Sequence, residues 1–164
     1  MITPASFHKH PIHPMLTAFP IALWCFSLVC DVVYHFGSQN TFWKGVAFYA
    51  IGAGILGALL AAIPGFIDYL SLTDPRATKI ASLHLALNLI VVVMFIFNLG
   101  IRYNALPSSG FLETLLSAIG IGILGVSGWL GGALVFEHQV GVSTPEELKA
   151  VPPRIEKETE RRAA

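Results

Sequence analysis

Three histidines stand together just ahead of the first long apolar run of the chain. His8, His10 and His13 are interspersed with Pro11 and Pro14. Imidazole binds transition metals and haem iron, and its pKa lies near neutrality. Ionisable side chains at a membrane span are rare and mark functional positions. The segment therefore predicts a cofactor-binding or proton-handling site at the mouth of a membrane helix.

The composition of the chain indicates the solvent in which this site lies. Hydrophobic residues make up 54% of the 164 residues, and charged residues make up only 12%. This balance is too apolar for an ordinary soluble domain. A membrane-spanning helix needs about 20 apolar residues. Four runs of about this length are present: Pro14–Val33, Phe42–Ile67, Ile80–Ile101 and Phe111–Phe136.

We predict an all-α fold, an integral membrane four-helix bundle with short loops and with both termini on the same side. Residues 1–13 form a histidine-rich arm, residues 14–138 the transmembrane domain, and residues 139–164 a polar tail. The lipid bilayer is the expected environment. The net charge is zero, so nothing points to a nucleic-acid partner.

The distribution of lysine and arginine predicts the orientation of the bundle. An even number of spans places the two termini and the connection between the second and third runs on one side. That side carries eight basic residues: Lys9, Arg76, Lys79, Lys149, Arg154, Lys157, Arg161 and Arg162. Only Lys44 and Arg102 belong to the other side. Because cytoplasmic loops carry an excess of basic residues, we expect both termini in the cytoplasm.

Polar residues of the first and third runs follow one helical stripe each. The first stripe leads from His13 to Asp31 and the second from His84 to Arg102, and both pairs are 18 positions apart, a whole number of turns. The two runs cross the membrane in the same direction. Facing stripes would therefore bring His13 to His84 near the cytoplasmic side and Asp31 to Arg102 near the other side.

We expect Asp31 and Arg102 to form an ion pair, because pairing removes much of the free-energy cost of a charge near hydrocarbon. The alternative is that both side chains reach the headgroup layer as interfacial anchors. Glu113 and Lys44 lie near the same side and are competing partners.

The second and fourth runs are rich in glycine, and each leads to one ionisable residue on the histidine side. Small residues let helices approach closely in lipid. The second run delivers Asp68, and a continued fourth helix would place His138 on the stripe of Gly120 and Ser127. We therefore expect five residues to converge near the cytoplasmic interface: His10, His13, Asp68, His84 and His138.

Such a cluster is compatible with four functions. In a haem b site, His13 and His84 would be the axial ligands, and Asp68 or Asn88 would orient a ring. A non-haem transition metal could use all five residues of the cluster. Proton handling and a ligand-free hydrogen-bonded network in a structural or accessory subunit are the other two. The chain has no hydrolase or transferase motif, which leaves at most a redox or electron-transfer role.

Short motifs along the chain form a recognisable set: His10-Pro11-Ile12-His13-Pro14-Met15, Phe19-Pro20, Ala61 to Asp68, His84 with Asn88, Arg102, Gly128 to Gly132, Leu134 to Phe136 and Val140 to Val142. Together they resemble a bacterial family of four-span inner-membrane proteins of unknown function, over about His8 to Val142. Members of that family occur beside or fused to redox proteins. The resemblance thus implies the bacterial inner membrane, electron transfer, and redox proteins or other membrane subunits as partners.

The chain departs from the pattern of this family at one position. The family often has a polar or acidic residue after the paired glycines, where this chain has Ala133. A ligand role at that position is therefore excluded here.

Overall fold

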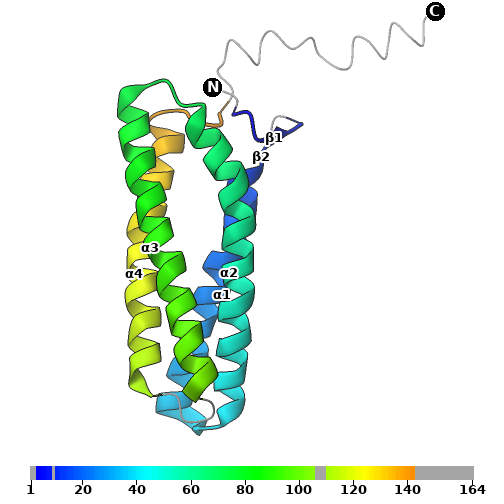
Figure 1. The fold of residues 1–164 in the computed structure, drawn as a ribbon, viewed down its shortest axis with the longest axis vertical. Helices are drawn as coiled ribbons and strands as arrows, with labels where there is room; N and C mark the ends of the chain where they lie inside the picture. Colours follow the sequence, from blue (N-terminus) through cyan, green and yellow to red (C-terminus); the bar gives the residue numbers. More distant parts are fainter. Residues whose placement is uncertain (1–2, 9, 106–109, 143–164) are drawn as a thin grey trace, which may run out of the picture.

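The chain folds into a bundle of four long helices that run alternately up and down (Figure 1). The computed structural model describes residues 3–8, 10–105 and 110–142. The helices are α1 (Ile12–Val33), α2 (Thr41–Leu70), α3 (Pro75–Ala105) and α4 (Phe111–Phe136). All four are long and apolar enough to cross a membrane. The predicted all-α four-helix membrane bundle is confirmed.

The N-terminal arm is a small β-hairpin that docks on the end of α2. Strands β1 (Ser6–Phe7) and β2 (His10–Pro11) pair antiparallel. The backbone of Ala5 holds the arm in place, because its N–H donates to Asp68 Oδ1 at 2.9 Å and its carbonyl accepts from Ile12 N at 3.0 Å. Helix α1 begins at Ile12, so His13 belongs to the helix and not to the arm.

The two ends of the bundle differ in their connections. One end carries the arm, the turn between α2 and α3, and the end of α4; we call it the histidine end, and it lies at the top of Figure 1. The opposite end carries the short π-helical segment η1 (Tyr34–Ser38), which links α1 to α2. We call this the arginine end. There the side chain of Asn40 caps α2 by accepting from Phe42 N at 2.9 Å.

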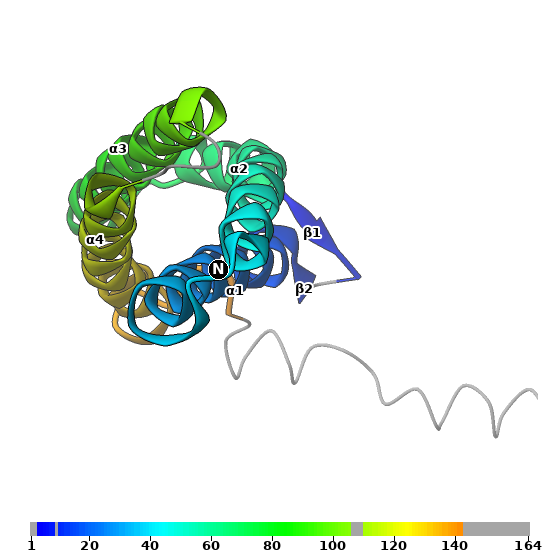
Figure 2. The same ribbon diagram turned by 90° about the horizontal axis from the view of Figure 1, so that it is seen from below.

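Helix α1 lies diagonally opposite α3, and α2 diagonally opposite α4, when the bundle is seen along its length (Figure 2). Three pairs of side chains connect α1 and α3 across the bundle. They are His13 with His84, Trp24 with Phe95, and Asp31 with Arg102. In each pair the α3 residue lies 71 positions after the α1 residue.

Glycines of α2 and α4 occupy equivalent positions as well, because each packs against one ring of these pairs. A Cβ atom on Gly54 would lie 2.4 Å from Nε1 of Trp24, and one on Gly120 would lie 3.0 Å from the Phe95 ring. Likewise, Cβ atoms on Gly65 and Gly131 would lie 2.6 Å from Nδ1 of His13 and 3.1 Å from Cε1 of His84. Each α4 glycine stands 66 positions after its α2 counterpart.

The hairpins α1–α2 and α3–α4 are therefore related by an approximate two-fold axis along the bundle. The two offsets differ by five because Gly54 follows Asp31 by 23 positions in the first hairpin, whereas Gly120 follows Arg102 by 18 positions in the second. Parallel repeats of this kind occur in membrane transporters, where the axis also runs along the membrane normal. Each hairpin packs much more extensively within itself than against the other hairpin. The helices are thus in closer contact within each hairpin than across the boundary between the hairpins.

An apolar layer fills the middle of the bundle. The rings of Trp24 and Phe95 stack on the axis with their centres 4.3 Å apart and their planes 6° from parallel. Ile51, Ile55 and Val91 complete this buried cluster. The layer separates the polar groups of the histidine end from those of the arginine end.

Candidate functional site at the histidine end

His13 and His84 meet edge to face on the approximate axis. Their ring centres are 6.3 Å apart and their planes are 88° from parallel. Nδ1 of His13 lies 2.8 Å from the carbonyl oxygen of Ala61, and Nδ1 of His84 lies 2.8 Å from that of Ser127. A carbonyl oxygen only accepts, so each Nδ1 carries a proton, and in a neutral imidazole Nε2 then presents a lone pair.

The carbonyls that hold the two rings occupy equivalent positions. Ser127 of α4 stands 66 positions after Ala61 of α2, as the paired glycines do. Each histidine is thus anchored by the second helix of its own hairpin. This arrangement leaves one basic nitrogen on each ring, contributed from either side of the hairpin boundary.

Asn88 makes the surroundings of the two rings unequal. Its Nδ2 lies 2.8 Å from the carbonyl oxygen of His84, 2.7 Å from Ser127 Oγ and 3.1 Å from His84 Nε2. An amide nitrogen has two hydrogens, so three acceptors compete for two donors, and Nε2 is the most distant. Thr17, at the equivalent position of α1, instead donates to the carbonyl of Pro14 at 3.0 Å.

The five residues predicted to converge do not form one cluster. His10 is exposed on β2, and the carboxylate of Asp68 accepts from the backbone of the arm rather than orienting a histidine. Within residues 3–8, 10–105 and 110–142, no three His, Cys, Asp or Glu side chains are placed to hold a metal ion. The backbone carbonyls of Ala61 and Ser127 take the orienting role expected of Asp68 or Asn88.

His138 lies outside the site because α4 ends before it. The helix stops at Phe136, Gln139 adopts a left-handed φ of 52°, and Val140 N donates to the carbonyl of Leu134 at 3.0 Å. A left-handed residue of this kind commonly ends a helix. The condition for placing His138 on the stripe of Gly120 and Ser127, a helix that continues through it, is therefore not met.

His138 instead contacts Asp74, the residue that caps the start of α3. Asp74 accepts from the backbone N–H groups of Ala77 at 3.1 Å and Arg76 at 3.2 Å, and His138 Nδ1 lies 3.3 Å from its Oδ2. These bonds lower the pKa of the Asp74 carboxyl, with the bond from Ala77 making the largest contribution, because each favours the ionised form.

The arginine end holds the predicted ion pair. Arg102 donates to both carboxylate oxygens of Asp31, from Nη1 at 2.8 Å and from Nη2 at 2.6 Å. Arg102 and Asp31 are only 1% and 3% exposed, so they lie inside the bundle and are not headgroup anchors. Nε of Arg102 donates to Asn98 Oδ1 at 3.0 Å, and Asn98 in turn donates to Ser117 Oγ at 2.9 Å.

Other polar groups surround this pair without replacing it. Lys44 is buried, and its Nζ lies 4.0 Å from the centre of the Tyr34 ring. The buried residue Glu113 accepts at its backbone carbonyl from Asn98 Nδ2 at 2.9 Å. His35 on η1 bonds Thr114 Oγ1 at 3.1 Å. His35 is thus at the end opposite to His13 and His84.

One protein-family model matches most of the chain. The family model described as "Predicted membrane protein (DUF2231)" matches residues 9–144. The chain belongs to this family. Neither the curated proteins nor the solved structures gave a match. The DUF2231 family is one of unknown function, so the family assignment supports the membrane location but assigns no chemistry.

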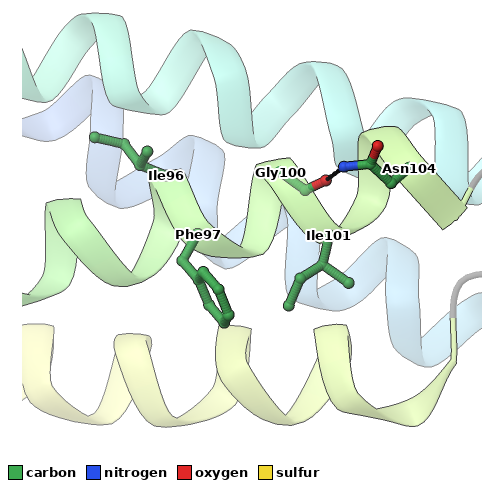
Figure 3. Close-up of a pocket in the computed structure, with 5 residues that line it drawn as sticks. All are labelled: Ile96, Phe97, Gly100, Ile101 and Asn104. Atoms are coloured by element: carbon green, nitrogen blue, oxygen red, sulfur yellow. Dashed lines mark hydrogen bonds between the residues drawn. The ribbon is translucent and has the colours of Figure 1, made fainter.

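A shallow hollow on the outer face of α3 is separate from the histidine pair of this DUF2231 protein. It is lined by Ile96, Phe97, Gly100, Ile101 and Asn104, and Asn104 Nδ2 donates to the carbonyl of Gly100 at 2.8 Å (Figure 3). Ile96 follows His84 by 12 positions, about 18 Å along the helix. The exposed apolar side chains around it suit contact with lipid chains.

The sequence motifs did not reveal the approximate symmetry or the carbonyl anchors. The only signal for the repeat was that equivalent residues recur at spacings of 11 and 7, in His13, Trp24 and Asp31 and again in their α3 counterparts. Trp24 pairs with Phe95 and Asp31 with Arg102, so the equivalent residues differ in type. A comparison of residue identities between the two halves therefore does not detect the repeat. Backbone carbonyl anchors leave no trace in the sequence.

Proposed function

We propose that this DUF2231 protein binds haem b between its two hairpins, with His13 and His84 as the axial ligands, and that it transfers electrons in the membrane. The observation that carries this proposal is the pair of imidazoles on the axis. They come from different hairpins, and each has its Nδ1 fixed on a carbonyl. Metal-bound histidines in proteins almost always have this second hydrogen bond.

The separation of the rings suits two ligands on one iron. Two imidazoles bound through Nε2 to opposite faces of a haem have ring centres roughly 6 Å apart, since each bond to iron is about 2 Å and each ring centre lies about 1 Å behind its nitrogen. The observed distance is 6.3 Å. A tetrahedral metal would bring the ring centres closer together than two axial ligands of one iron.

A haem held by both rings would lie between the two hairpins. A plane perpendicular to the line between the two rings lies along the boundary of the hairpins, where packing is least extensive. A bound haem would supply a one-electron carrier, and the protein's part is to hold the ligands neutral and to exclude water.

One contact favours a second candidate, a ligand-free structural or accessory subunit. Asn88 Nδ2 lies 3.1 Å from His84 Nε2, which is the nitrogen that iron would use. However, Asn88 has two nearer acceptors for its two hydrogens, the carbonyl of His84 and Ser127 Oγ. It can therefore release Nε2 without losing a hydrogen bond.

The visible spectrum of the purified protein separates the two candidates. Protein from haem-replete cells should show a reduced-minus-oxidised difference spectrum of haem b with one haem per chain. His13→Ala and His84→Ala should each lose most of this signal, whereas His35→Ala, on the arginine end, should retain it. A colourless wild type would leave the structural subunit as the function.

We further propose that the protein lies in the bacterial inner membrane with the histidine end toward the cytoplasm. The excess of basic residues on the side of the two termini supports this orientation. A reporter fused after Ala164 should be active in the cytoplasm, and one inserted at Ser38 should be active in the periplasm. The opposite pair of results would place the histidine pair on the outer side.

A further inference from the structure

The hollow on the outer face of α3 owes its shape to a glycine between larger side chains. A Cβ placed on Gly100 would meet nothing within 4 Å. Ile96 points to one side of the helix, whereas Phe97 and Ile101 point to the other side, toward α4 (Figure 3). The hollow has a volume of about 630 Å³. This volume lies within the range of small-molecule sites, which is about 300–1,000 Å³.

The hollow leads from the headgroup layer into one leaflet of the bilayer. Its lining extends from Ile96 to Asn104, which is about 12 Å along the helix. Asn104 stands one residue before the end of α3, and its neighbour Tyr103 is 74% exposed. Tyrosine is enriched at the depth of the headgroups. Half of the hydrocarbon core is about 15 Å thick, so an acyl chain of a single leaflet is long enough to fill the hollow.

The polar groups around the hollow favour a neutral ligand. Asn104 Nδ2 donates one of its two hydrogens to the carbonyl of Gly100 at 2.8 Å, and the other is left for an ester carbonyl of a lipid. In the part of the chain that the structure describes, the arginine end has no exposed charge that would select an ionic headgroup. Its four charged residues are all buried: Asp31, Lys44, Arg102 and Glu113.

We propose that this hollow binds one phospholipid of the surrounding bilayer, with an acyl chain over Gly100 and an ester carbonyl on the amide of Asn104. The hollow is continuous with the outer face of the four spans, which the bilayer covers. Because the lipid is held by apolar contacts and by a neutral ester group, its binding does not depend on the charge of the headgroup. The site lies at the end opposite to the histidine pair and does not rest on the haem proposal.

Native mass spectrometry of the protein in detergent, titrated with phosphatidylcholine, tests this inference. The wild type should bind one phosphatidylcholine more tightly than any further lipid. Gly100→Leu fills the hollow and should weaken this first binding about ten-fold, because the acyl chain loses its apolar contacts. Gly122→Leu, on the exposed face of α4, is the matched control, since a Cβ there also meets nothing within 4 Å. This control should leave the affinity unchanged.

Asn104→Leu covers the case in which Gly100→Leu fails to fold. It removes the amide and should weaken the first binding about five-fold, the usual effect of losing one hydrogen bond. Phosphatidylglycerol, which is anionic, should bind the wild type as tightly as phosphatidylcholine does. Equal weakening by Gly100→Leu and Gly122→Leu, an unchanged affinity in Asn104→Leu, or a second copy of the chain bound in place of lipid would overturn the inference.

Discussion

The histidine end and the arginine end use equivalent positions of the same repeat but complete their bonding differently. At the arginine end, Asp31 and Arg102 bond each other through two short contacts, and Asn98 and Ser117 take the remaining donors. At the histidine end, the two rings meet without a bond between them, and each is anchored through Nδ1 on a backbone carbonyl, while the Asn88 amide also lies 3.1 Å from Nε2 of His84.

The charges explain this difference. A guanidinium and a carboxylate inside a bundle must be neutralised and fully hydrogen-bonded, because an uncompensated buried charge is very unfavourable. A neutral imidazole carries a much smaller penalty, so one nitrogen can be left for a ligand. The comparison indicates that the arginine end is a closed structural element, and it supports our proposal of a ligand at the histidine end.

Breaking the ion pair should give the largest loss of stability. Asp31→Asn leaves Arg102 as an uncompensated buried charge, which typically costs about 3–5 kcal/mol. The free energy of unfolding in detergent measures this loss. The exchange of charges, Asp31→Arg with Arg102→Asp, should restore part of it, whereas Glu137→Gln, at an exposed site beyond α4, should change little. If Asp31→Asn were as stable as the wild type, the arginine end would not be a structural lock.

Filling the glycine contacts should have the next largest effect. Gly54→Ala places a Cβ 2.4 Å from the Trp24 indole and should destabilise the bundle by about 1–3 kcal/mol, the usual range for overpacking. A Cβ on Gly122 of α4 meets nothing within 4 Å. Gly122→Ala is therefore the matched control and should be neutral or slightly stabilising. Equal thermal stability of both variants would contradict the packing of the middle layer.

The sequence predicted the four helices and two of the facing pairs, His13 with His84 and Asp31 with Arg102. Both predictions follow from regular helix geometry. The apolar runs gave the four spans, and the spacing of 18 positions predicted which residue of α3 faces His13 and Asp31. Contacts made by irregular backbone were not predictable in this way. Helix α4 ends with a left-handed residue at Gln139, so His138 leaves the predicted stripe, and the arm folds back to occupy Asp68.

The smallest expected effect concerns the exposed contact between Asp74 and His138. The pKa of Asp74 is below its ordinary value of 3.8, so the carboxylate stabilises the folded protein above that pH, and this contribution is lost as the pH falls through the lowered pKa. Asp74→Ala should therefore lower the melting temperature by a few degrees at pH 7 but not near pH 2. A pH-independent difference would contradict a role for the ionised carboxylate.

The low-temperature electron paramagnetic resonance spectrum of the oxidised wild type tests the haem site most directly. Ferric haem bound by both His13 and His84 should be low-spin, because two imidazoles give a strong ligand field, and the planes of the two rings are 88° from parallel. It should give the highly anisotropic signal typical of perpendicular axial imidazoles. A high-spin signal would mean that only one histidine binds the iron, and the absence of any haem signal from haem-replete protein would contradict a haem site at the histidine end.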